Sequence, residues 1–280
     1  MNVQKIAAFS DGDTGGNPAG VLIAEQHPSE AEMRQIAADV GFSETAFAAP
    51  LQDAFRVRYF SPESEVPFCG HATIALGAAL AMSEGDGTFK LVLNEAEITV
   101  EGRQQEGRIS AALQSPPTHS AAAPPELVAE VLALFGYTAD DLDPNLPPAC
   151  ANGGADHLIV GLNTRAALAA MQYDLAAGRD LMNREALVTI MFAYAETPQR
   201  FHTRNPFASG GVYEDPATGA ATAAFGGYLR DIGWPHGGVI DIVQGEDMGM
   251  RSLLRAEISA VPNSSIRISG TARVMQTSPA

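Results

Sequence analysis

The sequence predicts an α+β fold made of two similar halves, each with strands wrapped around one central helix. Three observations lead to this prediction: a repeated apolar segment, strand-like runs along the whole chain, and a Pro/Ala-rich stretch near the middle. A chain of 280 residues also exceeds the usual size of one domain. We therefore expect two domains of comparable size.

The repeat is the most informative of these observations. Residues 69–80 read CGHATIALGAAL and residues 218–229 read TGAATAAFGGYL, and both contain Gly-x-Ala-Thr-x-Ala-x-Gly-x-x-Leu at an offset of 149 residues (219 − 70). Each copy is apolar on nearly every side, which is typical of a buried helix. We expect two central helices that begin near Gly70 and Gly219. A chance match of alanine-rich helices is the alternative.

The remaining elements follow from local signals. Residues 29–41 predict a helix with Ser29 as N-cap and Gly41 as its stop. Further helices are expected at 125–136, 164–178 and 183–191. Strands are expected at 3–10, 44–50, 54–62, 88–102, 107–113, 157–162, 252–258 and 265–275. Residues 114–126 are the clearest linker, so we place the domains at 1–116, joined by 266–280, and at 117–265.

The charge balance limits the classes of partner. The formal net charge is −16 and the pI is about 4.6. Such a chain repels phosphate backbones and anionic headgroups, which disfavours nucleic acid and membrane surfaces. A small anionic substrate would have to be held by local donors. Two cysteines give no disulfide framework, and we see no secretion signal and no long apolar run, so we expect a cytoplasmic protein.

Three polar residues are candidates for chemistry. Glu44 lies between Phe42 and Phe47, where desolvation would raise the pKa of the carboxyl and suit it to proton transfer. His71 lies in the first turn of the first buried helix, and Asp215 lies just before the second. The purely structural alternatives are that Glu44 lies in a turn, that His71 is a buried structural histidine, and that Asp215 caps a helix. The coincidence of His71 and Asp215 at two equivalent helix starts favours a site.

Other chemistries have weaker support in the sequence. Cys69 and His71 are two residues apart, a separation that does not place a thiol and an imidazole on one helical face, so a cysteine hydrolase is disfavoured. No spacing of Cys69, His71 and the distant histidines resembles a metal site. No phosphate-binding glycine motif is present, so neither metal nor nucleotide cofactor is expected.

Several phrases together resemble the phenazine-biosynthesis PhzF family over essentially the whole chain. They are GNPAGVL, MRQIAADVGFSETAF, VRYFSPESEVPFCGHATIALG, GVYEDPATGAATAAFGGYL and QGEDMGMRSLL. The resemblance implies a fold like that of diaminopimelate epimerase, with two pseudo-symmetric domains, a site in the cleft between them, and a homodimer. It also implies a cofactor-free isomerase. The founding activity of the family is isomerisation of trans-2,3-dihydro-3-hydroxyanthranilate.

The resemblance also implies roles for individual residues. Glu44 would shuttle a proton between carbon atoms, and His71 and Asp215 would orient the polar groups of the substrate. Substrate-binding residues would be Ser43, Gly70, His71, Gly219 and Ala220. One departure concerns Ala220, because the family commonly has serine there. This departure questions the phenazine substrate more than it questions the proton transfer.

Two alternatives to this isomerase remain open. The first is a protein of the same fold that binds a small carboxylate without turnover, which the missing serine hydroxyl favours. The second is an epimerase or racemase of an amino-acid-like substrate. A mechanism with two thiol bases is disfavoured, because Thr218 stands where a second cysteine would be needed and a hydroxyl is far too weak an acid.

Overall fold

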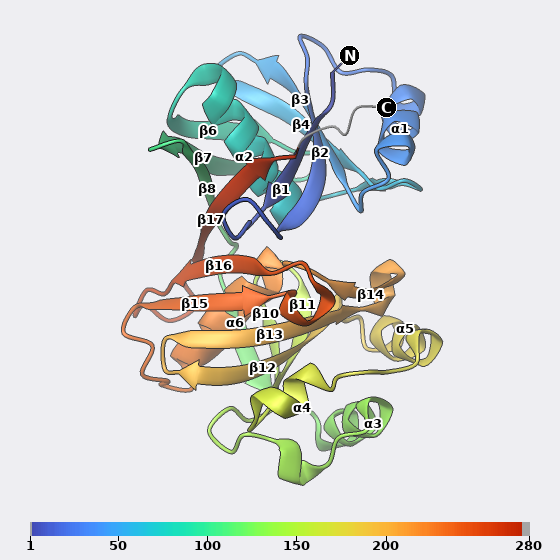
Figure 1. Cartoon of the computed structure of the whole chain (residues 1–280), viewed down its shortest axis with the longest axis vertical. Coiled ribbons are helices and arrows are strands. Elements are labelled where there is room, and N and C mark those ends of the chain that lie inside the picture. The colour runs from blue at the N-terminus through green and yellow to red at the C-terminus, as the bar shows by residue number, and fades with distance from the viewer. Residues whose placement is uncertain (1, 276–280) are drawn as a thin grey trace. The chain divides into compact units, whose positions relative to one another are not determined.

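The computed structural model describes residues 2–275, which divide into two compact units. Unit 1 extends to Gln114 and includes the segment that begins at Ser269, and unit 2 is Ser115–Ile268. Both units combine a curled sheet with a central helix (Figure 1). The predicted α+β class is therefore confirmed. Within the described residues, the helices are too short or too polar to cross a lipid bilayer.

Unit 1 is a closed barrel around helix α2 (Gly70–Glu84). Strand pairing runs β1–β2–β3–β4–β6–β7–β8, and β17 closes the barrel by pairing with both β8 and β1. The strands are β1 (Gln4–Ala8), β2 (Asn17–Ile23), β3 (Thr45–Leu51), β4 (Ala54–Phe60), β5 (Glu65–Val66), β6 (Gly87–Val92), β7 (Glu97–Gln105), β8 (Arg108–Gln114) and β17 (Arg267–Val274). Helix α1 (Glu30–Val40) connects β2 to β3.

Unit 2 also has a curled sheet around a central helix, α6 (Gly219–Asp231). Its strands are β9 (His119–Ala122), β10 (Ala149–Asn152), β11 (Asp156–Gly161), β12 (Thr189–Thr197), β13 (Arg200–Phe207), β14 (Val212–Asp215), β15 (Val239–Gln244) and β16 (Ser252–Glu257). Its other helices are α3 (Pro125–Phe135), α4 (Arg165–Ala169) and α5 (Leu175–Arg184), with short 3₁₀ turns at Ala139–Asp141, Ala208–Gly210 and Glu246–Met248.

The two units share the order and the sense of their strand pairs. In unit 1 the pairs β1–β2, β2–β3, β3–β4, β4–β6 and β6–β7 are antiparallel, parallel, antiparallel, parallel and antiparallel. In unit 2 the pairs β10–β11, β11–β12, β12–β13, β13–β15 and β15–β16 have the same senses in the same order. Helices α2 and α6 occupy equivalent places and begin at the predicted residues, Gly70 and Gly219. The repeat is therefore structural, and a chance match is excluded.

Four local predictions need correction. Of the helix expected at 183–191, residues 185–191 are not helical, because α5 ends at Arg184, Ala186 has a left-handed φ of 55°, and the β-branched residues that follow enter β12. Strand β12 lies between β11 and β13. A strand that is buried on both faces has a continuous run of apolar residues, and this pattern cannot be distinguished from that of a buried helix. Residues 88–102 form two strands instead of one, and the expected linker contains β9. The single helix expected at 164–178 is divided into α4 and the start of α5, because Asp174 caps a new helix with its side chain.

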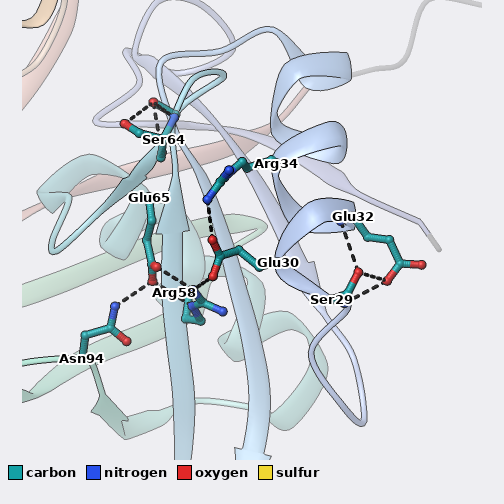
Figure 2. Close-up of polar contacts among 9 residues, drawn as sticks. Ser29, Glu30, Glu32, Arg34, Arg58, Ser64, Glu65 and Asn94 are labelled. Carbon is teal, nitrogen blue, oxygen red and sulfur yellow. Dashed lines mark hydrogen bonds and ion pairs between the residues drawn. The ribbon is translucent and has the colours of Figure 1, made fainter.

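Helix α1 is held to the barrel by its N-terminal residues (Figure 2). Ser29 and Glu32 form a capping box, and Gly41 ends the helix in a left-handed conformation, as predicted. Glu30 accepts a hydrogen bond from Arg58 on β4 at 3.1 Å, and Arg58 also binds Glu65 on β5 through two bonds. This network fixes β5, from which the chain continues to the start of α2.

The packing of α2 depends on close approach of the backbone of β7. A Cβ atom on Gly102 would lie 2.2 Å from the carbonyl oxygen of Gly77 in α2. Gly102→Ala is therefore expected to lower the free energy of unfolding by about 1–3 kcal/mol, the usual effect of overpacking. Gly87 is the matched control, since it pairs directly with Gly102 on β6 and its added Cβ would make only ordinary contacts. Equal urea midpoints for the two alanine variants would contradict this account.

A buried histidine makes unit 2 sensitive to acid. His157 on β11 is fully buried, its Nδ1 lies 2.8 Å from the Thr189 hydroxyl, and its Nε2 has no hydrogen-bond partner among the described residues. Desolvation lowers the pKa of His157 from 6.5 to about 4. The unfolded chain takes up this proton below pH 6.5 and the folded chain does not, so stability falls as the pH drops from 6.5 to about 4.

This histidine effect should amount to roughly 3 kcal/mol across the full window. Urea unfolding at pH 7, 5.5 and 4.5 would measure it. A His157→Gln variant should lose this part of the pH dependence and retain the part that belongs to the carboxyl groups. Identical pH slopes for the two proteins would show that His157 ionises freely in the folded state.

Candidate active site

In unit 1 the candidate residues meet at the start of α2. Glu44 directly precedes β3, and its backbone carbonyl accepts a hydrogen bond from the amide of Gly20 at 3.1 Å. His71 is the second residue of α2, and the N-cap of that helix is Cys69. These positions follow from the barrel, because β3 lies between β2 and β4 and α2 fills the interior.

Glu44 and His71 form a close and largely buried pair. The distance from Glu44 Oε2 to His71 Nε2 is 3.4 Å, and the side chains are 14% and 8% exposed. Ser43 Oγ lies 3.5 Å from the same ring nitrogen. An imidazole N–H directed at the carboxylate would hold it in place and would balance its charge during proton transfer. The structure thus brings together three of the residues that the sequence analysis assigned to the site.

Cys69 belongs to the same cluster, contrary to the expectation from spacing. Its Sγ lies 3.3 Å from His71 Nδ1 and 4.0 Å from Nε2. The rule that residues two apart diverge applies within a helix. Cys69 is the N-cap and has an extended backbone, with φ of −144° and ψ of 116°, so its side chain turns toward the ring of His71. The thiol–imidazole contact that the sequence analysis rejected is therefore present.

In unit 2 a second group of polar residues surrounds the start of α6. Thr218 is the N-cap, but its hydroxyl donates to Asp215 Oδ2 at 2.5 Å and makes no cap bond to the helix. The side chain of Gln244, at the end of β15, accepts from the Thr218 amide at 3.1 Å and donates to the Asp215 carbonyl at 2.7 Å. Asp215 therefore does not cap α6. Its carboxylate is held by Thr218 at the strand-to-helix turn.

Glu214, the neighbour of Asp215, has a different role. Its side chain is buried and binds the guanidinium of Arg204 through two hydrogen bonds of 3.0 and 2.5 Å. Arg204 also donates to the backbone carbonyls of Ala169 and Met171. Both carboxylate oxygens of Glu214 thus accept hydrogen bonds from the guanidinium group of Arg204. Of the two adjacent carboxylates, only Asp215 is suited to contact a ligand.

The two central helices begin in the same unusual way. Neither has a side-chain cap bond at its N-terminus, and neither has an acidic residue in its first turn. Among the described residues, no N-cap side chain bonds to the first backbone N–H groups of these helices, which belong to residues such as Gly70, Gly219 and Ala220. Such ends attract anions through free amides and the helix dipole.

Gln244 is a further residue of this turn, for which no role was predicted. This residue is fully buried and joins the backbone of the β14–α6 turn to Thr218, to which its Nε2 donates at 3.1 Å. The following Gly245 has a φ of 72°, and a Cβ there would lie 2.8 Å from the Pro216 carbonyl. The Gln-Gly pair in QGEDMGMRSLL could have indicated this role. A glycine often marks a turn that needs a positive φ, and a neighbouring amide side chain can hold such a turn by hydrogen bonds.

Comparison with known proteins gives a consistent result along the whole chain. The family model described as phenazine biosynthesis-like protein matches residues 6–278. The uncharacterized isomerase YddE of Escherichia coli strain K12 is 30% identical over 98% of this chain and 96% of its own length. The trans-2,3-dihydro-3-hydroxyanthranilate isomerase of Pseudomonas aeruginosa is 32% identical over 95% of this chain and 94% of its own length.

Solved structures agree on the fold. A PhzF-family protein from Bacillus anthracis superposes with a TM-score of 0.86 at 22% identity, covering 99% of this chain and 98% of its own. A probable proline racemase from Agrobacterium radiobacter K84 superposes with a TM-score of 0.66 at 14% identity, covering 99% and 92%. The second match shows that this fold also occurs in a protein described as a probable proline racemase.

Proposed function

The chain belongs to the phenazine biosynthesis-like protein family, and we propose that this isomerase moves a proton between carbon atoms of a small carboxylate substrate. The observation that carries the proposal is the Glu44–His71 pair, in which a largely buried carboxylate lies 3.4 Å from an imidazole nitrogen. Glu44 acts as general base toward one carbon and as general acid toward another. The reaction needs no oxidant or reductant, because the proton removed is also returned.

His71 and Asp215 are assigned to positioning in this proposal. His71 holds the Glu44 carboxylate through Nε2, and the hydroxyl of Ser43 lies beside the same nitrogen. Asp215 receives polar hydrogens of the substrate, and Thr218 keeps its carboxylate in a fixed orientation.

The amides at the two helix starts are assigned to the substrate carboxylate. Gly70, His71, Gly219 and Ala220 supply these amides. Such local donors matter in a chain with a formal charge of −16, whose overall field repels anions. The alanine at position 220 lacks the serine hydroxyl that is common in the family. The proposed substrate is a small carboxylate of the dihydro-hydroxyanthranilate type, and at position 220 only the backbone amide is present to hold it. The expected homodimer and cytoplasmic location belong to the same proposal.

An epimerase that uses two thiol bases is the weaker candidate. Cys69 lies beside His71 and would be suited to act as one base. At the equivalent position of unit 2, the Thr218 hydroxyl donates to Asp215 and has no basic character. The asymmetry of the two helix starts therefore favours one carboxylate base.

Deuterium exchange tests the proposal directly. The protein is incubated in D₂O with trans-2,3-dihydro-3-hydroxyanthranilate and then with a panel of small carboxylates, and NMR follows deuterium at each carbon. Incorporation into at least one compound, with formation of its isomer, is the expected result. Tight binding of a carboxylate without exchange would instead identify a binding protein of the same fold.

A further inference from the structure

We propose that Glu44, Cys69 and His71 form a site for Zn²⁺ or a similar transition-metal ion, which inhibits the enzyme when it binds. The carboxylate, thiol and imidazole donor atoms all lie within 4.8 Å of one another. The three residues come from the start of β3 and the start of α2. This binding goes beyond the proposed isomerase activity, which uses no metal.

The distances suit a tetrahedral ion. His71 Nε2 lies 3.4 Å from Glu44 Oε2, and Cys69 Sγ lies 3.3 Å from His71 Nδ1 and 4.0 Å from Nε2. Zinc–ligand bonds of about 2.0–2.3 Å in a tetrahedron place neighbouring ligand atoms about 3.3–3.7 Å apart. Rotation of the Cys69 and His71 side chains would bring the thiolate, the carboxylate oxygen and one ring nitrogen to these separations. Water would supply the fourth ligand, as is usual where a protein offers three.

The charges and donor types select the class of ion. A thiolate and a carboxylate neutralise a dication in this largely buried place, and His71 binds in its neutral form. The start of α2 opposes a bare cation, but it also stabilises the Cys69 thiolate that the metal requires. Thiolate and imidazole ligands favour Zn²⁺ and Co²⁺, whereas Mg²⁺ and Ca²⁺ prefer oxygen ligands.

Inhibition follows from the identity of the ligands. On binding, the S–H bond of Cys69 breaks, a sulfur–metal bond forms, and the proton leaves to solvent. The ion also occupies Glu44 Oε2 and His71 Nε2, the atoms to which we assign proton transfer and its positioning. Metal and acid/base function at this carboxylate therefore exclude each other.

Cobalt is the probe for the test. The full chain is freed of metal with a chelator and titrated with Co²⁺ in the absence of substrate. We expect one ion per chain, a thiolate-to-cobalt charge-transfer band, displacement by Zn²⁺ and no displacement by excess Mg²⁺. Cys69→Ser should remove the band, and Glu44→Gln or His71→Gln should weaken binding at least about tenfold. Cys150→Ser is the matched control, because this second free thiol is also half-buried and lies in unit 2.

A second measurement uses the unaltered protein, in case a variant does not fold. Zn²⁺ should protect Cys69, and not Cys150, from alkylation by iodoacetamide, with the modified peptides counted by mass spectrometry. Absence of the cobalt band, a band that survives in a folded Cys69→Ser variant, or equal protection of the two cysteines would overturn the proposal. None of these results bears on the acid/base role of Glu44, because no substrate is present.

Discussion

Glu44→Gln is expected to lower the rate of deuterium incorporation into substrate carbon by about 10³-fold, the usual contribution of one general acid/base group. Glutamine keeps the shape of the side chain and one acceptor oxygen, but its amide cannot take a proton from carbon. The KM should change much less, because the proposed carboxylate contacts come from backbone amides. Measurement of kcat and KM by NMR, with an identified substrate, separates the two effects.

The control for Glu44→Gln is Glu25→Gln, which removes one carboxylate from an exposed position of the same unit. Its rate should match that of the unaltered protein. Circular dichroism and the urea midpoint should show that both variants are folded. A Glu44→Gln protein that retains full exchange would mean that another group transfers the proton, and Cys69, at 3.3 Å from His71, would become the first alternative to examine.

Much of this architecture could be predicted from the sequence because its signals are local or repeated. The capped helix α1 and the two central helices were located by cap residues and by the repeat. The error at residues 183–191 has a tertiary cause. A central strand that is buried on both faces loses the alternation that distinguishes strands, and only its neighbours β11 and β13 make it a strand.

The residues of the candidate site could be predicted from the sequence, but the contacts between their side chains could be predicted only in part. The resemblance placed Glu44 and His71 in one site, and the structure shows their ion-pair distance. The contact of Cys69 with His71 was missed, because an N-cap residue does not follow helical geometry. Glu44 is the third residue of this cluster, and the fold of the barrel places it beside Cys69 and His71. The spacing of residues along the chain therefore could not reveal the cluster.

Glu214→Gln should be the most destabilising single change in unit 2 among those considered, lowering the free energy of unfolding by about 3–5 kcal/mol. The reason is the partner that remains. The Arg204 side chain is only 9% exposed, and without the carboxylate its positive charge stays buried with neutral acceptors, namely two backbone carbonyls and the amide oxygen of the glutamine. Removing one partner of a buried ion pair lowers the free energy of unfolding by more than the intact pair contributes to it. The desolvation of the remaining ion is then no longer offset by attraction to its partner.

The matched control for this change is Asp241→Asn, which breaks the ion pair of Asp241 with Arg255 in the same unit. Those side chains are 51% and 56% exposed, and solvent screens their attraction, so a loss below about 1 kcal/mol is expected. Urea unfolding followed by circular dichroism compares the two variants with the unaltered chain. If Glu214→Gln were no more destabilising than Asp241→Asn, water would have to reach Arg204 in the folded protein. Because Glu214 directly precedes Asp215 on β14, the same variant should also weaken substrate binding, and the proposed position of Asp215 would then depend on this buried pair.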